Sequence, residues 1–72
     1  MPRKIRELKR DLRRAGFESR PGKGNHTFWR HPLLPATKVA LSGHDGDDAD
    51  HYQEEQVREA LEALRTVQEG PP

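Results

Sequence analysis

The stretch GKGNH, from Gly22 to His26, combines residue types that could bind a phosphate group and transfer a proton. Glycines let a phosphate approach the backbone N–H groups closely, and Lys23 adds a mobile cation at the same place. Because an imidazole exchanges protons near neutral pH, His26 would stand beside the phosphate as a general acid or base. These are the groups that RNA cleavage without a metal ion requires. Taken alone, the spacing is also compatible with a histidine that is structural or only binds phosphate.

Basic residues are concentrated in the half of the chain that contains this stretch. Residues 1–31 hold ten Lys and Arg against three acidic residues, a net charge of +7, whereas residues 32–72 have a net charge of −6. Such a split predicts that the first half meets a polyanion, although two merely solvated surfaces would also explain it. The residues predicted to bind RNA phosphates are Arg20, Gly22, Lys23, Gly24, Asn25 and Arg30.

Length and composition restrict the class of protein. A chain of 72 residues forms one domain with a small core, so no deep substrate cavity is expected. The absence of cysteine excludes disulfides and thiolate zinc sites. No apolar run approaches the ~20 residues of a membrane span, and the basic N-terminus lacks the apolar segment of a signal peptide. These features predict a soluble, cytoplasmic protein that does not interact with membranes, with a domain over residues 1–69 and a disordered tail over residues 70–72.

Helical periodicity marks the first element. Apolar residues recur at helical spacing from Ile5 to Ala15, and most arginines lie off that stripe. Gly16 can adopt the left-handed conformation just past a helix, and Phe17 can fold back onto its last turn. The pattern predicts an amphipathic helix that ends near Ala15.

Three short strands are expected to follow. Residues 17–20 and 26–31 read as a hairpin around the turn PGKG, and PLLP breaks the second strand. Residues 37–42 alternate again and form the third strand. Phe28 and Trp29 point to opposite faces of the sheet, so one of them is buried and the other could contact a base; the sequence does not tell which.

A second helix is expected after the acidic loop GHDGDDAD. Asp50 and Gln53 resemble a capping box at its start, and Glu54 and Arg58 have the spacing of an ion pair. Its apolar stripe comprises Val57, Ala60, Leu61, Leu64 and Val67. The sequence therefore predicts an α+β fold of order α-β-β-β-α, in which both helices pack on one face of a three-stranded antiparallel sheet.

The other histidines favour simpler interpretations. His31, beside a proline, reads as a polar residue at a strand end rather than as a second catalytic group, although an acid–base pair would need a second histidine. His44 and His51 flank the acidic loop. Because their spacing matches no compact ligand motif and DGDDAD lacks the EF-hand pattern, we predict no metal site and no cofactor.

The run AGFESRPGKGNHTFWRHP resembles the HicA family, the mRNA-interferase toxins of HicA–HicB toxin–antitoxin systems. The similarity covers Ile5 to about Ser42 well, and the second helix in arrangement only. It implies a fold like that of the double-stranded-RNA-binding domain, an endoribonuclease activity on mRNA, and a HicB-like antitoxin as partner. It also implies an active centre at Gly24, Asn25 and His26. Asn25 stands where serine is usual in the family, and the acidic loop is longer than the usual link.

The leading hypothesis is therefore a HicA-like toxin, a metal-independent endoribonuclease with His26 as its single catalytic histidine. The alternative is a non-catalytic RNA-binding module of the same fold, whose active centre has decayed through Asn25 and the acidic loop. A third possibility is a small regulatory domain that binds only another protein.

Overall fold

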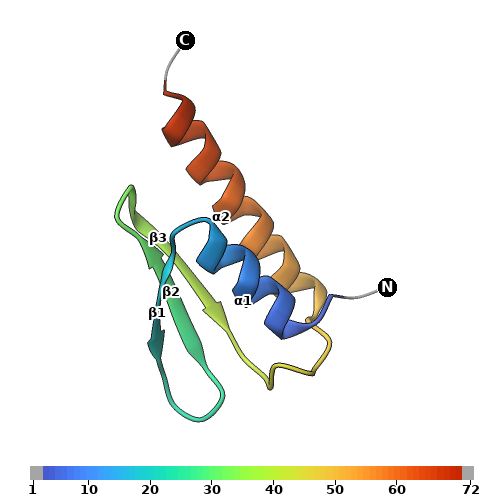
Figure 1. Cartoon of the computed structure of the whole chain (residues 1–72). Coiled ribbons are helices and arrows are strands. Elements are labelled where there is room, and N and C mark those ends of the chain that lie inside the picture. Colours follow the sequence, from blue (N-terminus) through green and yellow to red (C-terminus); the bar gives the residue numbers. More distant parts are fainter. Residues whose placement is uncertain (1–2, 71–72) are drawn as a thin grey trace.

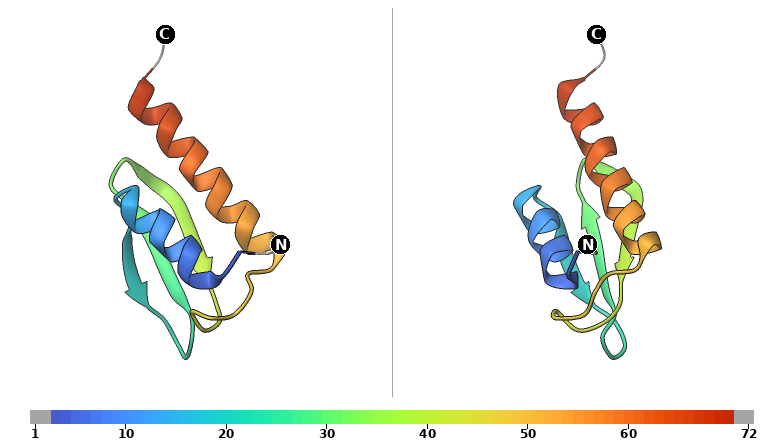
Figure 2. Two further views of the ribbon diagram at one scale, coloured as in Figure 1. Left: turned by 45° about the vertical axis from the view of Figure 1, so that its right-hand side comes forward. Right: turned by 90° about the vertical axis from the view of Figure 1, so that its right-hand side faces the viewer.

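The computed structural model describes residues 3–70, in which five elements follow one another (Figure 1). They are α1 (Ile5–Arg14), β1 (Glu18–Pro21), β2 (Thr27–His31), β3 (Leu34–Leu41) and α2 (His51–Glu69). The strands form one antiparallel sheet in the order β1-β2-β3, and both helices lie on the same side of it (Figure 2). The predicted α+β fold of order α-β-β-β-α is confirmed.

The predicted tail over residues 70–72 is described only at its first residue. Of the predicted tail, Gly70 follows α2 as its C-cap, and residues 71 and 72 lie outside the described residues. Within residues 3–70, neither helix is long and apolar enough to cross a membrane.

The end of α1 is set by local sequence. Ala15 is the C-cap, and Gly16 takes a left-handed φ of 95°. The Phe17 N–H donates to the Leu12 carbonyl at 3.0 Å and the Gly16 N–H to the Arg13 carbonyl at 3.0 Å, the two hydrogen bonds of a Schellman motif. Phe17 is buried, so the predicted helix end and its apolar contact are confirmed.

The two faces of the sheet differ in composition. Trp29 pairs in register with Val39, and both are buried under the helices with 1% exposure. Phe28 points to the opposite, open face, where the Lys38 ammonium lies 4.6 Å from its ring centroid. Trp29 is thus the core residue of the aromatic pair, and Phe28 belongs to a surface without a covering layer.

The predicted strand boundaries need correction. β3 begins at Leu34 rather than at residue 37, because PLLP does not end the pairing: Pro32 and Leu33 form a tight turn, and His31 pairs with Leu34. Pro35 then lies in β3, an edge strand, where a missing N–H removes no necessary ladder bond. β1 likewise runs through Pro21, and β2 begins one residue after His26.

Half of the predicted capping box is present at α2. The Asp50 carboxylate accepts a hydrogen bond from the Gln53 N–H at 2.8 Å, as expected of an N-cap. The Gln53 side chain does not reach back to Asp50. It is buried, and its Oε1 accepts from the Ser42 N–H at 2.9 Å, which ties the start of α2 to the end of β3.

Two further expectations for α2 are wrong. Arg58 pairs with Glu55 at 2.9 Å and with Glu62 at 3.2 Å rather than with Glu54. Val67 is 45% exposed, because the buried stripe ends at Leu64, and the helix beyond it has no sheet to cover.

Candidate functional site

The turn between β1 and β2 carries three backbone N–H groups at its tip. The Gly22 N–H donates to the His26 carbonyl at 2.9 Å, and the His26 N–H donates to the Lys23 carbonyl at 3.1 Å. These bonds close the hairpin and occupy the Gly22 amide. In the described part of the chain, the amides of Lys23, Gly24 and Asn25 have no hydrogen-bond acceptor. Successive free amides of this kind can hold an anion such as a phosphate.

The two glycines of the turn serve different needs. A Cβ on Gly22 would lie 2.7 Å from the Phe28 ring and 3.2 Å from Cβ of His26, so close packing requires glycine there. Gly24 has a φ of 60°, and a Cβ on it would meet no atom within 4 Å. Gly24 therefore combines a conformation that favours glycine with open space over the tip of the turn.

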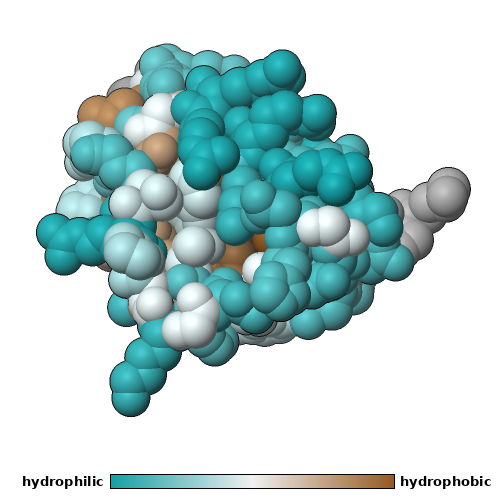
Figure 3. Space-filling view, turned by 60° about the horizontal axis from the view of Figure 1, so that its bottom comes forward, coloured by the Kyte–Doolittle hydropathy of each residue, from teal (hydrophilic) through white to brown (hydrophobic). Residues whose placement is uncertain are grey.

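A hollow beside this turn joins three segments that are distant in sequence. It lies where the turn, α1 and the loop 43–50 meet, and its lining residues are Lys9, Pro21, Gly24, Asn25, His26, Thr27, Gly43, His44 and Asp45. Figure 3, which brings this end of the molecule forward, shows a mainly hydrophilic surface. We call this site the turn hollow; Gly24, Asn25 and His26 all line it.

The Asn25 side chain contacts a second histidine in the turn hollow. Its Nδ2 lies 3.3 Å from Nε2 of His44, and both side chains are exposed to solvent. The imidazole of His26 is exposed as well. The hollow therefore contains two accessible imidazoles beside the free amides of the turn.

The acidic loop is docked against α1 rather than free in solvent. The Ile5 N–H donates to the Asp47 carbonyl at 2.9 Å, and the Arg6 N–H donates to the Asp45 carbonyl at 3.1 Å. These are orphan amides of the first turn of α1, so the loop caps this helix. The Lys9 ammonium hydrogen-bonds the Asp45 carboxylate at 2.7 Å and lowers the pKa of that carboxyl.

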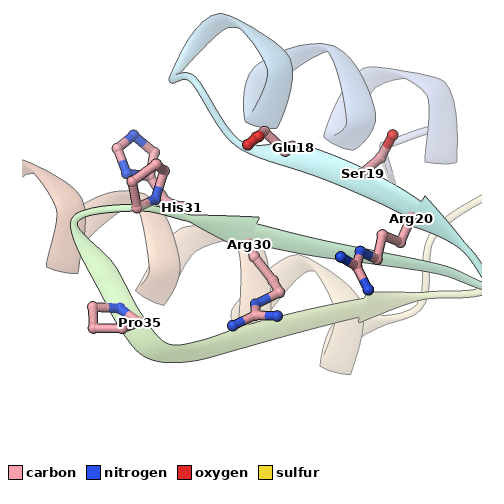
Figure 4. A pocket seen from close by; sticks show the side chains of 7 residues that line it. Glu18, Ser19, Arg20, Arg30, His31 and Pro35 are labelled. Carbon is pink, nitrogen blue, oxygen red and sulfur yellow. The ribbon is translucent and has the colours of Figure 1, made fainter.

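Arg20 and Arg30 lie on a different surface. In the sheet register Arg20 is opposite Phe28 and Arg30 is opposite Glu18, which places both arginines on the open face. Both arginines line a pocket together with Glu18, His31 and Pro35, and Figure 4 labels their side chains on β1 and β2. The structure thus separates the predicted RNA-binding residues: Gly24 and Asn25 line the turn hollow, and Gly22 and Lys23 lie in the same turn but outside its lining. Arg20 and Arg30 lie on the open face.

The remaining histidines lie elsewhere. His31 Nδ1 accepts a hydrogen bond from the Leu33 N–H at 3.0 Å, and the ring packs edge-on against Phe17 at 5.1 Å. This geometry agrees with a polar residue at a strand end. His51 is exposed in the first turn of α2. Among residues 3–70, no three His, Asp or Glu side chains gather as a metal-binding group.

Sequence reasoning missed the contributions of Lys9, His44 and Asp45 to this site. Lys9 is one of several basic residues on α1, and nothing in its spacing distinguishes it. His44 follows the third strand at the start of a loop that composition describes only as acidic. Their meeting depends on hydrogen bonds between the loop carbonyls and α1, which have no signature in side-chain types.

The comparison with protein families gives one match. A family model described as the HicA toxin of bacterial toxin–antitoxin systems matches residues 5–64. The match spans all three strands and most of both helices, including the turn hollow. No curated protein and no solved structure matches the chain significantly.

Proposed function

The chain belongs to the HicA toxin family of bacterial toxin–antitoxin systems, and on that premise we propose that it is a metal-independent endoribonuclease that cleaves mRNA in the turn hollow. The observation that carries the proposal is the position of His26. Its exposed imidazole directly follows the free amides of Lys23, Gly24 and Asn25, so a phosphate held by the amides would lie within reach of a proton-transfer group.

The reaction that suits these groups is internal transesterification of RNA. The 2′-oxygen attacks the adjacent phosphorus, the P–O2′ bond forms and the P–O5′ bond breaks, which yields a 2′,3′-cyclic phosphate and a free 5′-hydroxyl. A base takes the 2′-OH proton, and an acid gives a proton to the departing 5′-oxygen. His26 performs one of these transfers, while Lys23 and the turn amides stabilise the charge that develops on the phosphate oxygens.

In this proposal the residues of the open face bind RNA and take no part in the cleavage step. Arg20, Arg30 and Lys38 are exposed there around the Phe28 ring. Cations bind phosphates without regard to sequence, and an aromatic ring can stack on an unpaired base. An RNA strand that crosses this face would reach the turn hollow at the end of the β1–β2 hairpin.

A toxin of such a system works with an antitoxin, and we propose a HicB-like protein as the partner of this chain. A negatively charged partner would cover the exposed, basic surface around Lys23 and His26 and block access to the turn hollow. Co-expression with the product of the adjacent gene should relieve growth arrest and yield a stable complex. A neighbouring protein that neither binds nor neutralises the chain would contradict the assignment of that partner.

Cleavage in the presence of EDTA tests the enzymatic proposal. The purified chain should cut mRNA with EDTA present and leave 2′,3′-cyclic phosphate ends, and His26→Gln should lower the rate by about 10²–10⁴-fold. His51→Gln, which alters an exposed histidine outside the turn hollow, is the matched control and should cleave normally. Binding of RNA without cleavage by the wild-type chain would favour the non-catalytic module, and failure to bind RNA at any salt concentration would favour a protein-binding domain.

A further inference from the structure

A second imidazole in the turn hollow is oriented by an amide. His44 Nε2 lies 3.3 Å from Nδ2 of Asn25. In this arrangement the Asn25 amide donates to the His44 ring, a contact between two exposed side chains that a bound RNA hydroxyl can replace. An RNA 2′-OH that takes the place of this amide would meet the same ring nitrogen, which is the position from which a general base accepts a proton.

We propose that His44 is a second catalytic residue, which takes the 2′-OH proton from the RNA while His26 protonates the departing 5′-oxygen. This inference rests on the proposed function, because it assigns the two proton transfers of the same reaction. The proton that leaves O2′ ends on His44 Nε2, and the proton that O5′ receives leaves the His26 imidazolium. The two histidines exchange protonation states in each turnover, and hydrolysis of the cyclic phosphate or exchange with water restores them.

The backbone around His44 is held in place from two sides. The His44 N–H donates to the Asp47 carboxylate at 2.9 Å, and the Asp47 N–H donates to the His44 carbonyl at 3.0 Å. The Asp47 carbonyl in turn accepts from the Ile5 N–H at the start of α1. The loop therefore positions His44 through its contact with the helix, as a catalytic group requires.

Polar and charged side chains face His44 from each segment around the hollow. Asn25 and His26 face the hollow from the turn, Lys9 faces it from α1, and Asp45 faces it from the loop. Lys9 and Asp45 form an ion pair at 2.7 Å, and this pairing lowers the Asp45 pKa, so the carboxylate is ionised well below neutrality. Asp47 is occupied by the His44 backbone. Two of the side chains that face the hollow are thus imidazoles, the group that proteins use most often as general acid or base.

The other two histidines cannot take this role. His31 does not line the turn hollow; it lies at the other end of β2, where its Nδ1 accepts from the Leu33 backbone N–H and its ring packs against Phe17. His51 lines a separate depression between the helices, with Arg3 and Glu55. His44 is therefore the second histidine that shares the hollow with His26.

The pH dependence of the single-turnover rate tests the assignment. With an RNA oligonucleotide that contains a cleavage site mapped with the wild-type chain, the wild-type rate should follow a bell-shaped profile. His44→Gln keeps an acceptor for Asn25 but cannot titrate. It should lose about 10²-fold or more in rate, together with the acidic limb of the profile, because the limb that rises with pH reports a base. His26→Gln should instead lose the alkaline limb.

A modified substrate separates the acid from the base. When sulfur replaces the 5′-oxygen at the scissile phosphate, the leaving thiolate needs no proton. His26→Gln should then regain most of its lost rate, whereas His44→Gln should remain slow. Rescue of His44→Gln in place of His26→Gln would overturn the assignment of roles.

Controls distinguish this inference from a structural role and from the proposed function. His51→Gln should retain the wild-type rate and profile, and thermal unfolding should show that His44→Gln is folded. If the wild-type chain cleaves RNA and His44→Gln keeps its rate and acidic limb, the inference about His44 is wrong and the proposed function stands. If the wild-type chain does not cleave RNA in EDTA, the proposed function itself is wrong, and the assignment of His44 falls with it.

Discussion

The turn hollow and the open face of the sheet are both built from the β1–β2 hairpin, yet they present different chemistry. The hollow brings together imidazoles, free amides and an ion pair from three segments of the chain. The open face presents Arg20, Arg30 and Lys38 from the three strands, with Phe28 between them. The hollow is suited to proton transfer at one phosphate, and the open face to holding a longer polyanion.

The difference shows that proximity in sequence does not define one site here. Arg30 is four residues from His26, but strand alternation and register place its side chain on the open face. His44 is eighteen residues from His26 and shares its hollow. A site built at the end of a sheet collects residues from the segments that converge there, and the strands carry their own side chains to separate faces.

The largest expected effect is the difference in unfolding free energy between substitutions on the two faces of the sheet. Trp29→Ala removes a fully buried ring beneath the helices and should cost about 3–5 kcal/mol of unfolding free energy, enough to unfold most of so small a domain. Phe28→Ala, its neighbour on the open face, should cost about 1 kcal/mol. Urea unfolding followed by circular dichroism compares them, and equal losses would show that the open face is packed as tightly as the core.

Substitutions of the two turn glycines should affect stability and cleavage differently. Gly22→Ala places a methyl group against the Phe28 ring and should lower stability by about 1–3 kcal/mol. Gly24→Ala costs about 1 kcal/mol through its left-handed φ, but its methyl group projects over the tip of the turn, where the phosphate is proposed to bind. We expect Gly24→Ala to lower cleavage more than stability. Thermal unfolding and cleavage assays on both variants measure this, and the reverse ranking would move the phosphate away from Gly24.

Salt dependence tests the open face alone. Arg20→Gln and Arg30→Gln should each weaken RNA binding and reduce the slope of log affinity against log salt by about 0.7 if each arginine contacts one phosphate of a single strand. Arg65→Gln, near the end of α2, is the matched loss of charge and should leave the slope unchanged. Filter binding at several KCl concentrations gives the slopes. Unchanged slopes for the two strand variants would remove the open face from the RNA path.

The smallest expected effect concerns the ion pair between Lys9 of α1 and Asp45 of the acidic loop. Because Lys9 lowers the Asp45 pKa below its ordinary 3.8, the pair contributes stability above that pH and loses it as the pH falls through the lowered pKa. In Lys9→Gln the Asp45 pKa should rise towards its ordinary value, with a small loss of stability because the pair is exposed. An NMR titration of the Asp45 carboxyl carbon measures this. An Asp45 pKa unaffected by the substitution would show that Lys9 does not hold the loop.

Features that depend on neighbouring residues could be predicted from the sequence. The Schellman end of α1 follows from Gly16 and Phe17, and the cap of α2 follows from Asp50. The order of the elements and the presence of Gly24, Asn25 and His26 near the β1–β2 connection follow in the same way. In each case the interaction spans a few residues, so the pattern of residue types contains most of the information.

Features that depend on contacts between distant segments could not be predicted. Whether Phe28 or Trp29 is buried depends on which face receives the helices, and period-two alternation is the same for both choices. The Gln53 side chain turns to Ser42 because β3 ends beside α2. The place of His44 depends on loop carbonyls that cap α1, and backbone carbonyls are present in every residue.

The most direct test of the central claim measures two quantities on the same RNA, the single-turnover rate constant at saturating protein and the dissociation constant. We expect His26→Ala to lower the rate constant by about 10²–10⁴-fold and to leave the dissociation constant nearly unchanged. The double variant Arg20→Gln/Arg30→Gln should raise the dissociation constant and leave the rate constant at saturation nearly unchanged. A His26→Ala variant that keeps most of the wild-type rate constant, or that loses activity only in proportion to its RNA affinity, would contradict the claim that the turn hollow is the catalytic centre.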